Sequence, residues 1–245
     1  MLPPCDGGND VGRHLDNQLL ARLDPTVLAA LEPDLRIVHF DQGYVINETH
    51  AIVQKVYFPH SGIVSCVVEL IGGGAIETGM IGRDGQYGAA AALDHKVSLN
   101  LVVMQIAGDA SVIDADRLRD HVVLHPALRE QVMAYEQFFL SQVQQTSACN
   151  AVHKVEARIC KWLLRMQKLV GDDLILTQEF LAQMMGVRRT SVTEVCVGLQ
   201  RAGMITYSRG RIHIVDLAKI QATACECDDA VNSHYARIVQ PGSNI

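Results

Sequence analysis

The strongest constraint on this chain is a helical pattern that stops at a glycine and resumes within three residues. The run QEFLAQMM (178–185) follows Thr177, whose hydroxyl suits a helix N-cap, and Gly186 can adopt the positive φ at which helices end. A second helix is predicted from Arg189 to about Gly203. Two helices joined by so short a turn must cross each other, which is typical of a helix-turn-helix.

A hairpin pattern follows the second helix directly. Residues 204–215 (MITYSRGRIHIV) alternate in polarity, and their turn is predicted at 208–211, with Arg209 and Arg211 at the tip. Two helices followed by a hairpin predict a winged helix-turn-helix. In the helix-turn-helix arrangement the second helix enters the major groove of DNA with its N-terminal end first.

The start of the second helix carries side chains suited to DNA. An arginine there meets the positive end of the helix dipole, and an anionic partner offsets this unfavourable interaction. A guanidinium pairs with guanine O6 and N7, and a carboxylate accepts from cytosine N4. Side chains on the phosphate backbone fix position without reading sequence. We therefore expect base contacts from Arg189, Thr190, Thr193 and Glu194, and phosphate contacts from Arg188, Ser191, Arg209 and Arg211.

The opposite face of this helix is predicted to be buried. Val192, Val195 and Leu199 recur at i, i+3 and i+7, which places them on one stripe. Cys196 lies between these residues, and a buried cysteine usually packs as a small apolar side chain. The alternative for Cys196 is a redox thiol whose oxidation blocks DNA binding.

The charge distribution supports a polyanionic partner for this region alone. The chain has a net charge of −6, yet residues 154–217 hold ten Lys or Arg against six Asp or Glu. Residues 1–153 hold nine against eighteen. No apolar run approaches the ~18 residues of a membrane helix, and the N-terminus lacks a signal-peptide pattern. Seven scattered cysteines fit reduced thiols, so we expect a cytoplasmic protein.

Upstream, the pattern changes from strands to a long helix. Residues 35–113 hold short apolar runs between turn residues, which predicts a β-roll or barrel, with a hairpin turn at 72–74 (GGG). A helix is predicted from Pro126 to about Ala151, with apolar residues at spacings of four and three, as in a coiled-coil seam. We expect two chains to pair along this dimer helix through Leu128, Val132, Tyr135, Phe139 and Val143.

The predicted fold class is α+β, with a β-roll, a long dimerisation helix and a winged helix-turn-helix. The parts are a loose N-terminal segment (1–18), a β-roll sensor domain (19–120), the dimerisation helix (121–153), the DNA-binding domain (154–217) and a C-terminal tail helix (218–245).

This order resembles the bacterial CRP/FNR transcription regulators over about residues 19–217. The resemblance rests on LTQEFLAQMMGVRRTSVTEVCVGLQRAGMI and on VYFPHSGIV and DGQYG in the roll. It implies a homodimeric, sequence-specific regulator that binds a pseudo-palindromic operator and whose β-roll is cyclic-nucleotide-binding-like. The family's guanine-reading arginine falls on Arg189, and its next specificity positions fall on Thr190 and Glu194. The expected partners are double-stranded DNA, a second copy of the chain and RNA polymerase, with no membrane.

The resemblance also locates an effector cassette, which is degenerate here. After Gly88, the family's ribose-binding glutamate falls on Ala89, and its phosphate-binding Arg-Ser/Thr pair falls on Ser98 and Leu99. A phosphate without its arginine would be a buried unpaired charge, which is costly. We therefore expect no cAMP or cGMP and predict no cofactor, although an apolar effector or a haem stays open.

Metal and catalytic sites are not predicted. His121 and His125 are spaced i, i+4 but lack a clear third ligand, and Cys225-x-Cys227 lacks a partner pair. Cys5 is a single N-terminal cysteine, whereas an iron–sulfur cluster needs several. No Ser/His/Asp set, carboxylate pair or nucleotide fingerprint is present in a fitting context, so we expect no enzyme.

Two other functions remain open at this point. One is a ligand-binding or scaffold module with a vestigial helix-turn-helix. The other is a redox- or gas-responsive member of the same family, acting through a thiol or through haem held by His60, His121 or His125.

Overall fold

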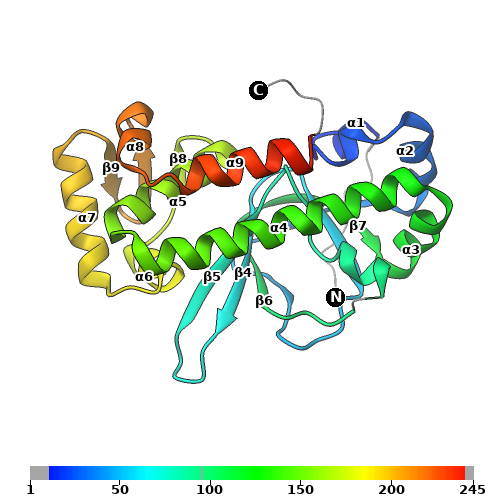
Figure 1. Ribbon diagram of the computed structural model, residues 1–245, viewed down its shortest axis with the longest axis horizontal. Coiled ribbons are helices and arrows are strands. Elements are labelled where there is room, and N and C mark those ends of the chain that lie inside the picture. Colours follow the sequence, from blue (N-terminus) through cyan, green and yellow to red (C-terminus); the bar gives the residue numbers. More distant parts are fainter. Residues whose placement is uncertain (1–10, 95, 241–245) are drawn as a thin grey trace.

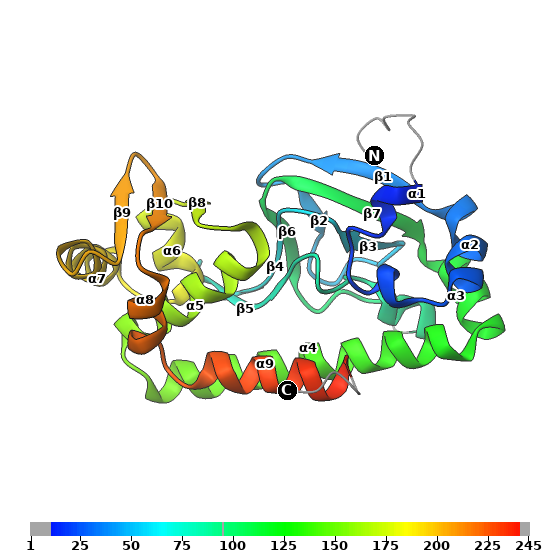
Figure 2. The same ribbon diagram turned by 90° about the horizontal axis from the view of Figure 1, so that it is seen from above.

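The computed structural model describes residues 11–94 and 96–240, which form a β-roll and a winged helix-turn-helix (Figure 1). A long helix, α4 (Pro126–Val152), passes along both units, and the last helix, α9 (Cys227–Ile238), lies beside it (Figures 1 and 2). The predicted fold class is therefore confirmed. No helix in the described ranges is both long and apolar enough to cross a membrane.

The β-roll consists of two antiparallel sheets. The first has the order β1 (Arg36–Phe40), β7 (Gly108–Asp114), β3 (Lys55–Pro59). The second has the order β2 (Val45–Asn47), β6 (Leu101–Ile106), β4 (Ile63–Glu69), β5 (Ala75–Ile81). Strands β2 and β5 were not predicted. The GGG hairpin turn is confirmed, because Leu70 N donates to Gly74 O at 2.7 Å where β4 returns as β5.

The segment before β1 is more firmly attached than expected. It holds α1 (Val11–His14), η1 (Leu20–Arg22), α2 (Pro25–Leu31) and η2 (Glu32–Asp34). Asn17 is fully buried, and its Nδ2 donates to Pro59 O and Gly85 O, both at 2.9 Å. The expectation of a loose segment over 1–18 is thus wrong for residues 11–18, because a side-chain amide ties them to the roll. Residues 1–10 lie outside the described residues.

Two helices follow the roll and are separated by one residue. α3 (Ala115–Leu124) stops before His125, which has φ −123° and ψ 92°, because proline disfavours helical backbone at the residue before it. α4 then begins with Pro126 at its first position and spans 27 residues, about 40 Å. Since α3 runs through residue 121, the boundary placed there falls inside a helix. η3 (Ala89–Leu93) packs against α3.

The apolar stripe of α4 packs on this chain's own roll. Leu128, Val132 and Tyr135 are 1–3% exposed in the single chain and belong to its core, so they cannot form the predicted dimer seam. Phe139 and Val143, also assigned to that seam, line a pocket of the roll. The exposed large apolar side chains of α4 are instead Met133, Leu140 and, at its end, Val152; Met133 and Leu140 are 51% and 56% exposed and spaced i, i+7.

The C-terminal unit contains the predicted helices and hairpin. Its elements are α5 (Val155–Val170), β8 (Asp173–Ile175), α6 (Gln178–Met185), α7 (Arg189–Arg201), β9 (Ile205–Ser208), β10 (Arg211–Ile214) and α8 (Leu217–Thr223). Strand β8 was not predicted and pairs with the outer side of β10. The core of this unit lies between α5, α6, α7 and the hairpin, and Ile159, Leu163 and Val192 are fully buried in it.

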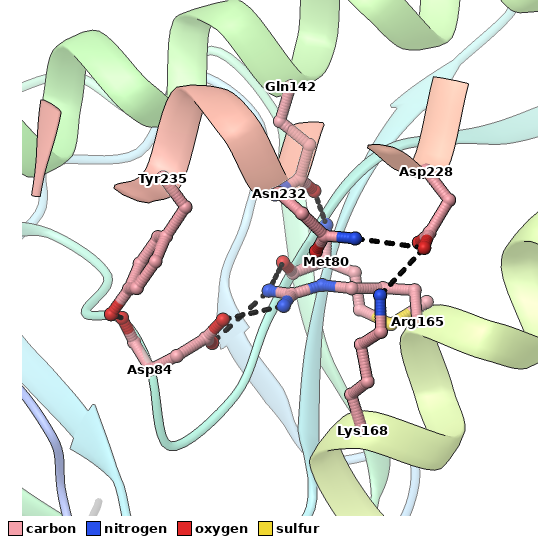
Figure 3. A network of polar contacts seen from close by, with 8 residues as sticks. All are labelled: Met80, Asp84, Gln142, Arg165, Lys168, Asp228, Asn232 and Tyr235. Carbon is pink, nitrogen blue, oxygen red and sulfur yellow. Dashed lines mark hydrogen bonds and ion pairs between the residues drawn. The ribbon is translucent and has the colours of Figure 1, made fainter. Parts of the chain in front are cut away.

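A polar network joins the C-terminal unit to the roll (Figure 3). The Arg165 guanidinium of α5 donates to both carboxylate oxygens of Asp84, at 2.5 and 3.1 Å, and to Met80 O at 3.3 Å. Arg165 and Asp84 are only 13% and 11% exposed, so this is a buried, bidentate ion pair. It fixes the first helix of the DNA-binding unit against the loop after β5.

The tail helix α9 and α4 complete the same network (Figure 3). Tyr235 Oη donates to Asp84 O at 2.8 Å. Asp228 accepts from Lys168 Nζ at 2.6 Å and from Asn232 Nδ2 at 2.9 Å. Gln142 Oε1 of α4 accepts from Met80 N at 2.7 Å. Roll, long helix, tail and DNA-binding unit are therefore held as one body.

Candidate nucleic-acid interface

The turn between α6 and α7 has the predicted local geometry. Thr177 Oγ1 accepts from Phe180 N at 3.1 Å, which caps α6. Gly186 has φ 62° and ψ 37°, and Val187 N donates to Ala182 O at 3.0 Å, so α6 ends in a left-handed C-cap. Arg188 is the N-cap of α7 and makes no side-chain cap hydrogen bond, which leaves its guanidinium exposed.

The buried face of α7 is Val192, Cys196 and Leu199, all at most 1% exposed. Val195, predicted for that face, is only half-buried, because Cys196 continues the stripe at i+4 from Val192. Burial raises the pKa of the Cys196 thiol to about 11. The thiolate is the reactive species, so burial and the raised pKa favour the packing role of Cys196 over the redox alternative.

The outward face of α7 presents the predicted base-reading side chains. Arg189, Thr190, Thr193 and Glu194 are all exposed. Arg189 Nη1 pairs with Glu179 Oε2 of α6 at 3.2 Å, and the two side chains are 67% and 74% exposed. Because such surface pairs contribute at most ~1 kcal/mol, a guanine or phosphate can replace Glu179 at little cost. Thr193 Oγ1 already lies 2.8 Å from Gln178 Oε1.

The wing carries the other two predicted arginines. Arg209 has φ 49° and Gly210 has φ 74°, the pair of positive values that a type I′ hairpin turn requires, which confirms the predicted turn. Arg209 and Arg211 are both exposed. The hairpin β9–β10 and α7 lie at the end of the molecule remote from β1 (Figure 2). Ser191, also predicted to bind phosphate, is half-buried near the start of α7.

A pocket of about 430 Å³ lies between the roll and α4. Of the predicted effector positions, Gly88, Ser98 and Leu99 line it, whereas Ala89 is fully buried and does not. In the part of the chain that the structure describes, no Lys or Arg side chain lines this pocket. Its acidic group, Glu136, accepts from Gln86 Nε2 at 2.8 Å.

The histidines weighed as haem or metal ligands have protein partners. His60 Nε2 lies 2.6 Å from Ser111 Oγ, and burial lowers the pKa of His60 to about 4. His121 Nε2 lies 2.9 Å from Asp34 Oδ2, and its ring stacks on that of His125.

One expectation about cysteines is wrong. Cys225 and Cys227 were thought to lack a partner pair, but the fold places Cys149 and His153, from the end of α4, next to them. The i, i+4 spacing of Cys149 and His153 was the available sequence signal.

A buried carboxyl lies at the contact between roll and DNA-binding unit. Glu77 of β5 accepts from Ser65 Oγ at 2.5 Å and from Trp162 Nε1 of α5 at 2.7 Å. Burial raises the pKa of Glu77 to about 7, and the two hydrogen bonds and the nearby Lys161 and Arg165 offset only part of this effect. Sequence reasoning missed Glu77, because its environment comes from residues far along the chain.

These features define a winged helix-turn-helix attached to a cyclic-nucleotide-binding-like roll. Residues 157–223 match the family model of the Crp-like helix-turn-helix domain. The chain therefore carries a Crp-like helix-turn-helix domain, and its fold is that of solved CRP/FNR-family transcriptional regulators. The comparison with curated proteins finds no match.

Several solved structures are similar to this chain over most of its length. FixK2 from Bradyrhizobium japonicum is 13% identical with a TM-score of 0.66, over 78% of this chain and 98% of that one. The c-di-GMP-responsive regulator CLP from Xanthomonas campestris is 15% identical with a TM-score of 0.64, over 78% and 99%. A CRP-family transcriptional regulator from Thermus thermophilus, TTHB099, is 22% identical with a TM-score of 0.62, over 76% and 95%.

Proposed function

We propose that the protein is a sequence-specific, DNA-binding transcription regulator that acts as a homodimer on a pseudo-palindromic operator. The observation that supports this most directly is the outward face of α7, where Arg189 and Glu194 are exposed at the N-terminal end of the second helix. Arg209 and Arg211 on the wing tip supply cations on the same end of the molecule.

Base readout is assigned to Arg189, Thr190 and Glu194, and backbone contacts to Arg188, Ser191, Arg209 and Arg211. Arg189 reads guanine after it exchanges Glu179 for the base, and Glu194 accepts from a cytosine amino group. Thr193 also stays among the proposed base contacts, because its hydroxyl donates to Gln178 Oε1 at an exposed position and would exchange this bond for a base as Arg189 exchanges Glu179.

Dimerisation is assigned to the outer face of α4. Met133 and Leu140 are large apolar side chains with more than half of their surface exposed, and their spacing of seven suits a helix–helix seam. Leu140 also lines the roll pocket, so a partner helix on this face would border the pocket. A ligand in the pocket would therefore touch the same residue as the partner helix. A change in this contact would pass along α4 and alter the distance between the two α7 helices.

The effector of the roll is proposed to be neutral or cationic rather than a cyclic nucleotide. The lining is largely apolar and includes Glu136, and a phosphodiester would find no guanidinium among the described lining residues. Burying that anion without a partner is strongly unfavourable. RNA polymerase is the proposed downstream partner, as for a regulator of this fold.

The function is tested by selecting binding sites from random duplex DNA with the full-length protein and then measuring affinity against salt. Recovery of a two-fold symmetric site with half-sites about 34 Å apart is expected. Replacing Arg209 or Arg211 with Ala should weaken binding to all sequences and reduce the salt slope by about 1 for each lost contact. Arg36→Ala, an exposed arginine on the roll, is the matched control. A non-specific pool would count against the proposal.

A further inference from the structure

Four potential metal ligands meet where α4 ends and the tail begins. Cys149 and His153 come from the last turn of α4 and its C-cap, Cys225 precedes α9, and Cys227 is the first residue of α9. Their ligand atoms all lie within 4.8 Å of one another, and the three cysteines are free and buried.

Two of the distances between these atoms are close to those around a tetrahedral ion, and the others are at most 4.8 Å. Cys149 Sγ lies 3.5 Å from Cys225 Sγ, and Cys227 Sγ lies 3.5 Å from His153 Nδ1. Zinc–sulfur bonds of about 2.3 Å and zinc–nitrogen bonds of about 2.0–2.1 Å at tetrahedral angles give about 3.8 Å between two sulfurs and about 3.6 Å between sulfur and nitrogen. Small side-chain adjustments therefore suffice to place an ion between the four groups.

The surrounding polar groups are oriented as for a metal site. His153 Nε2 lies 3.2 Å from Glu226 Oε1, which leaves Nδ1 directed at the cysteines. A carboxylate on the outer nitrogen of a ligating histidine fixes the ring and its tautomer. Gln145 Nε2 donates to Cys227 Sγ at 3.1 Å, and a negatively charged sulfur is the better acceptor for such a donor.

We infer that Cys149, His153, Cys225 and Cys227 bind one Zn²⁺ ion per chain. Three thiolates and one imidazole form a closed, four-ligand set typical of structural zinc, and the soft sulfur ligands disfavour Mg²⁺ and Ca²⁺. The ion fastens the tail to His153 (φ −95°, ψ 145°), the first of the two extended residues between α4 and α5. It thereby stiffens the junction between the long helix and the DNA-binding unit.

The test is a titration of the reduced, metal-free full-length protein with Co²⁺, followed by Zn²⁺. Tetrahedral thiolate coordination gives sulfur-to-cobalt charge-transfer bands in the near ultraviolet and intense d–d bands in the visible. The expected result is saturation at one Co²⁺ per chain and loss of the bands when one equivalent of Zn²⁺ is added. Absence of these bands in the folded, reduced protein would overturn the inference.

Variants separate the site from other cysteines. Cys227→Ala and His153→Ala should shift the cobalt bands and weaken Co²⁺ affinity, whereas Cys66→Ala, which replaces a buried cysteine of the roll, should change neither. Glu226→Gln should keep the spectrum and the stoichiometry but weaken Co²⁺ affinity by about 10- to 100-fold. A Cys227→Ala spectrum and affinity equal to those of the unmodified protein would contradict the assignment. Circular dichroism shows whether each variant folds. Where a variant does not fold, the Co²⁺ titration of the unmodified protein still tests the site.

Discussion

Replacement of Glu77 with Gln should remove a pH-dependent loss of stability. Glu77 lies between β5 and α5, where Ser65 and Trp162 donate to its carboxyl group. Burial raises its pKa from the ordinary value of 4.5 to about 7. Glutamine preserves the shape and the bond from Trp162, and its amide can donate to the Ser65 hydroxyl, but it carries no charge at any pH.

The sign follows from the proton balance. An acid whose pKa is higher in the folded state contributes stability that is fully present below pH 4.5, and this contribution is lost as the pH rises to about 7. The complete loss is about 3 kcal/mol, at ~1.4 kcal/mol per pH unit. Between about pH 5 and pH 8, the stability of the unmodified protein relative to Glu77→Gln should therefore fall by about 2–3 kcal/mol.

The assay is urea unfolding of both proteins at these two pH values. Trp162, the sole tryptophan, bonds to Glu77, so its fluorescence reports this contact directly. Glu48→Gln, at an exposed position, controls for the loss of one negative charge. If the difference in unfolding free energy between the unmodified protein and Glu77→Gln is the same at both pH values, the reasoning about the buried carboxyl is refuted.

Three further predictions concern other parts of the molecule. Asp84→Ala leaves the Arg165 guanidinium buried without its partner, so it should lower the free energy of unfolding, measured in urea, by about 3–5 kcal/mol. The double variant Asp84→Ala/Arg165→Met should recover most of this loss. A loss under ~1 kcal/mol for Asp84→Ala would disprove the burial argument. Leu140→Glu places a charge on the outer face of α4 and should convert a dimer into a monomer in light scattering, with unchanged circular dichroism; a persistent dimer would exclude this seam. Cys196 should resist iodoacetamide in the native protein and react in urea, because the thiol is buried and its pKa is raised to about 11; rapid native labelling, read by mass spectrometry, would contradict this.

Features determined by a few neighbouring residues could be predicted from the sequence. Thr177 caps α6 through Phe180 N at 3.1 Å, and Gly186 ends α6, as their local chemistry requires. The hairpin turn at Arg209 and Gly210 has the same origin. These signals act within one helical turn or one hairpin, so no tertiary information is needed.

The role of α4 could not be predicted in the same way. Spacings of three and four describe both a stripe buried in the chain's own core and a seam between two chains. Tyr135 satisfies the pattern but packs under the roll, where Gly85 leaves room for it. Only the position of the roll shows that Met133 and Leu140 form the free face.

Long-range clusters were likewise beyond sequence reasoning. Cys149 and Cys225 are 76 positions apart, and their sulfurs meet only because α9 returns along α4. Arg165 and Asp84 are 81 positions apart, and they meet because α5 packs against the roll. Such groups acquire their chemistry from the packing of whole helices, which no short pattern encodes.

The most direct test of the account is the effect of Arg189 on base discrimination. Affinities of the unmodified protein and Arg189→Ala are measured for the selected operator and for the same operator with the contacted G·C pair replaced. The account predicts that the base change costs the unmodified protein on the order of 10- to 100-fold in affinity and costs Arg189→Ala nothing further. An Arg189→Ala protein that still discriminates as strongly as the unmodified protein would contradict the claim that α7 reads DNA through this residue.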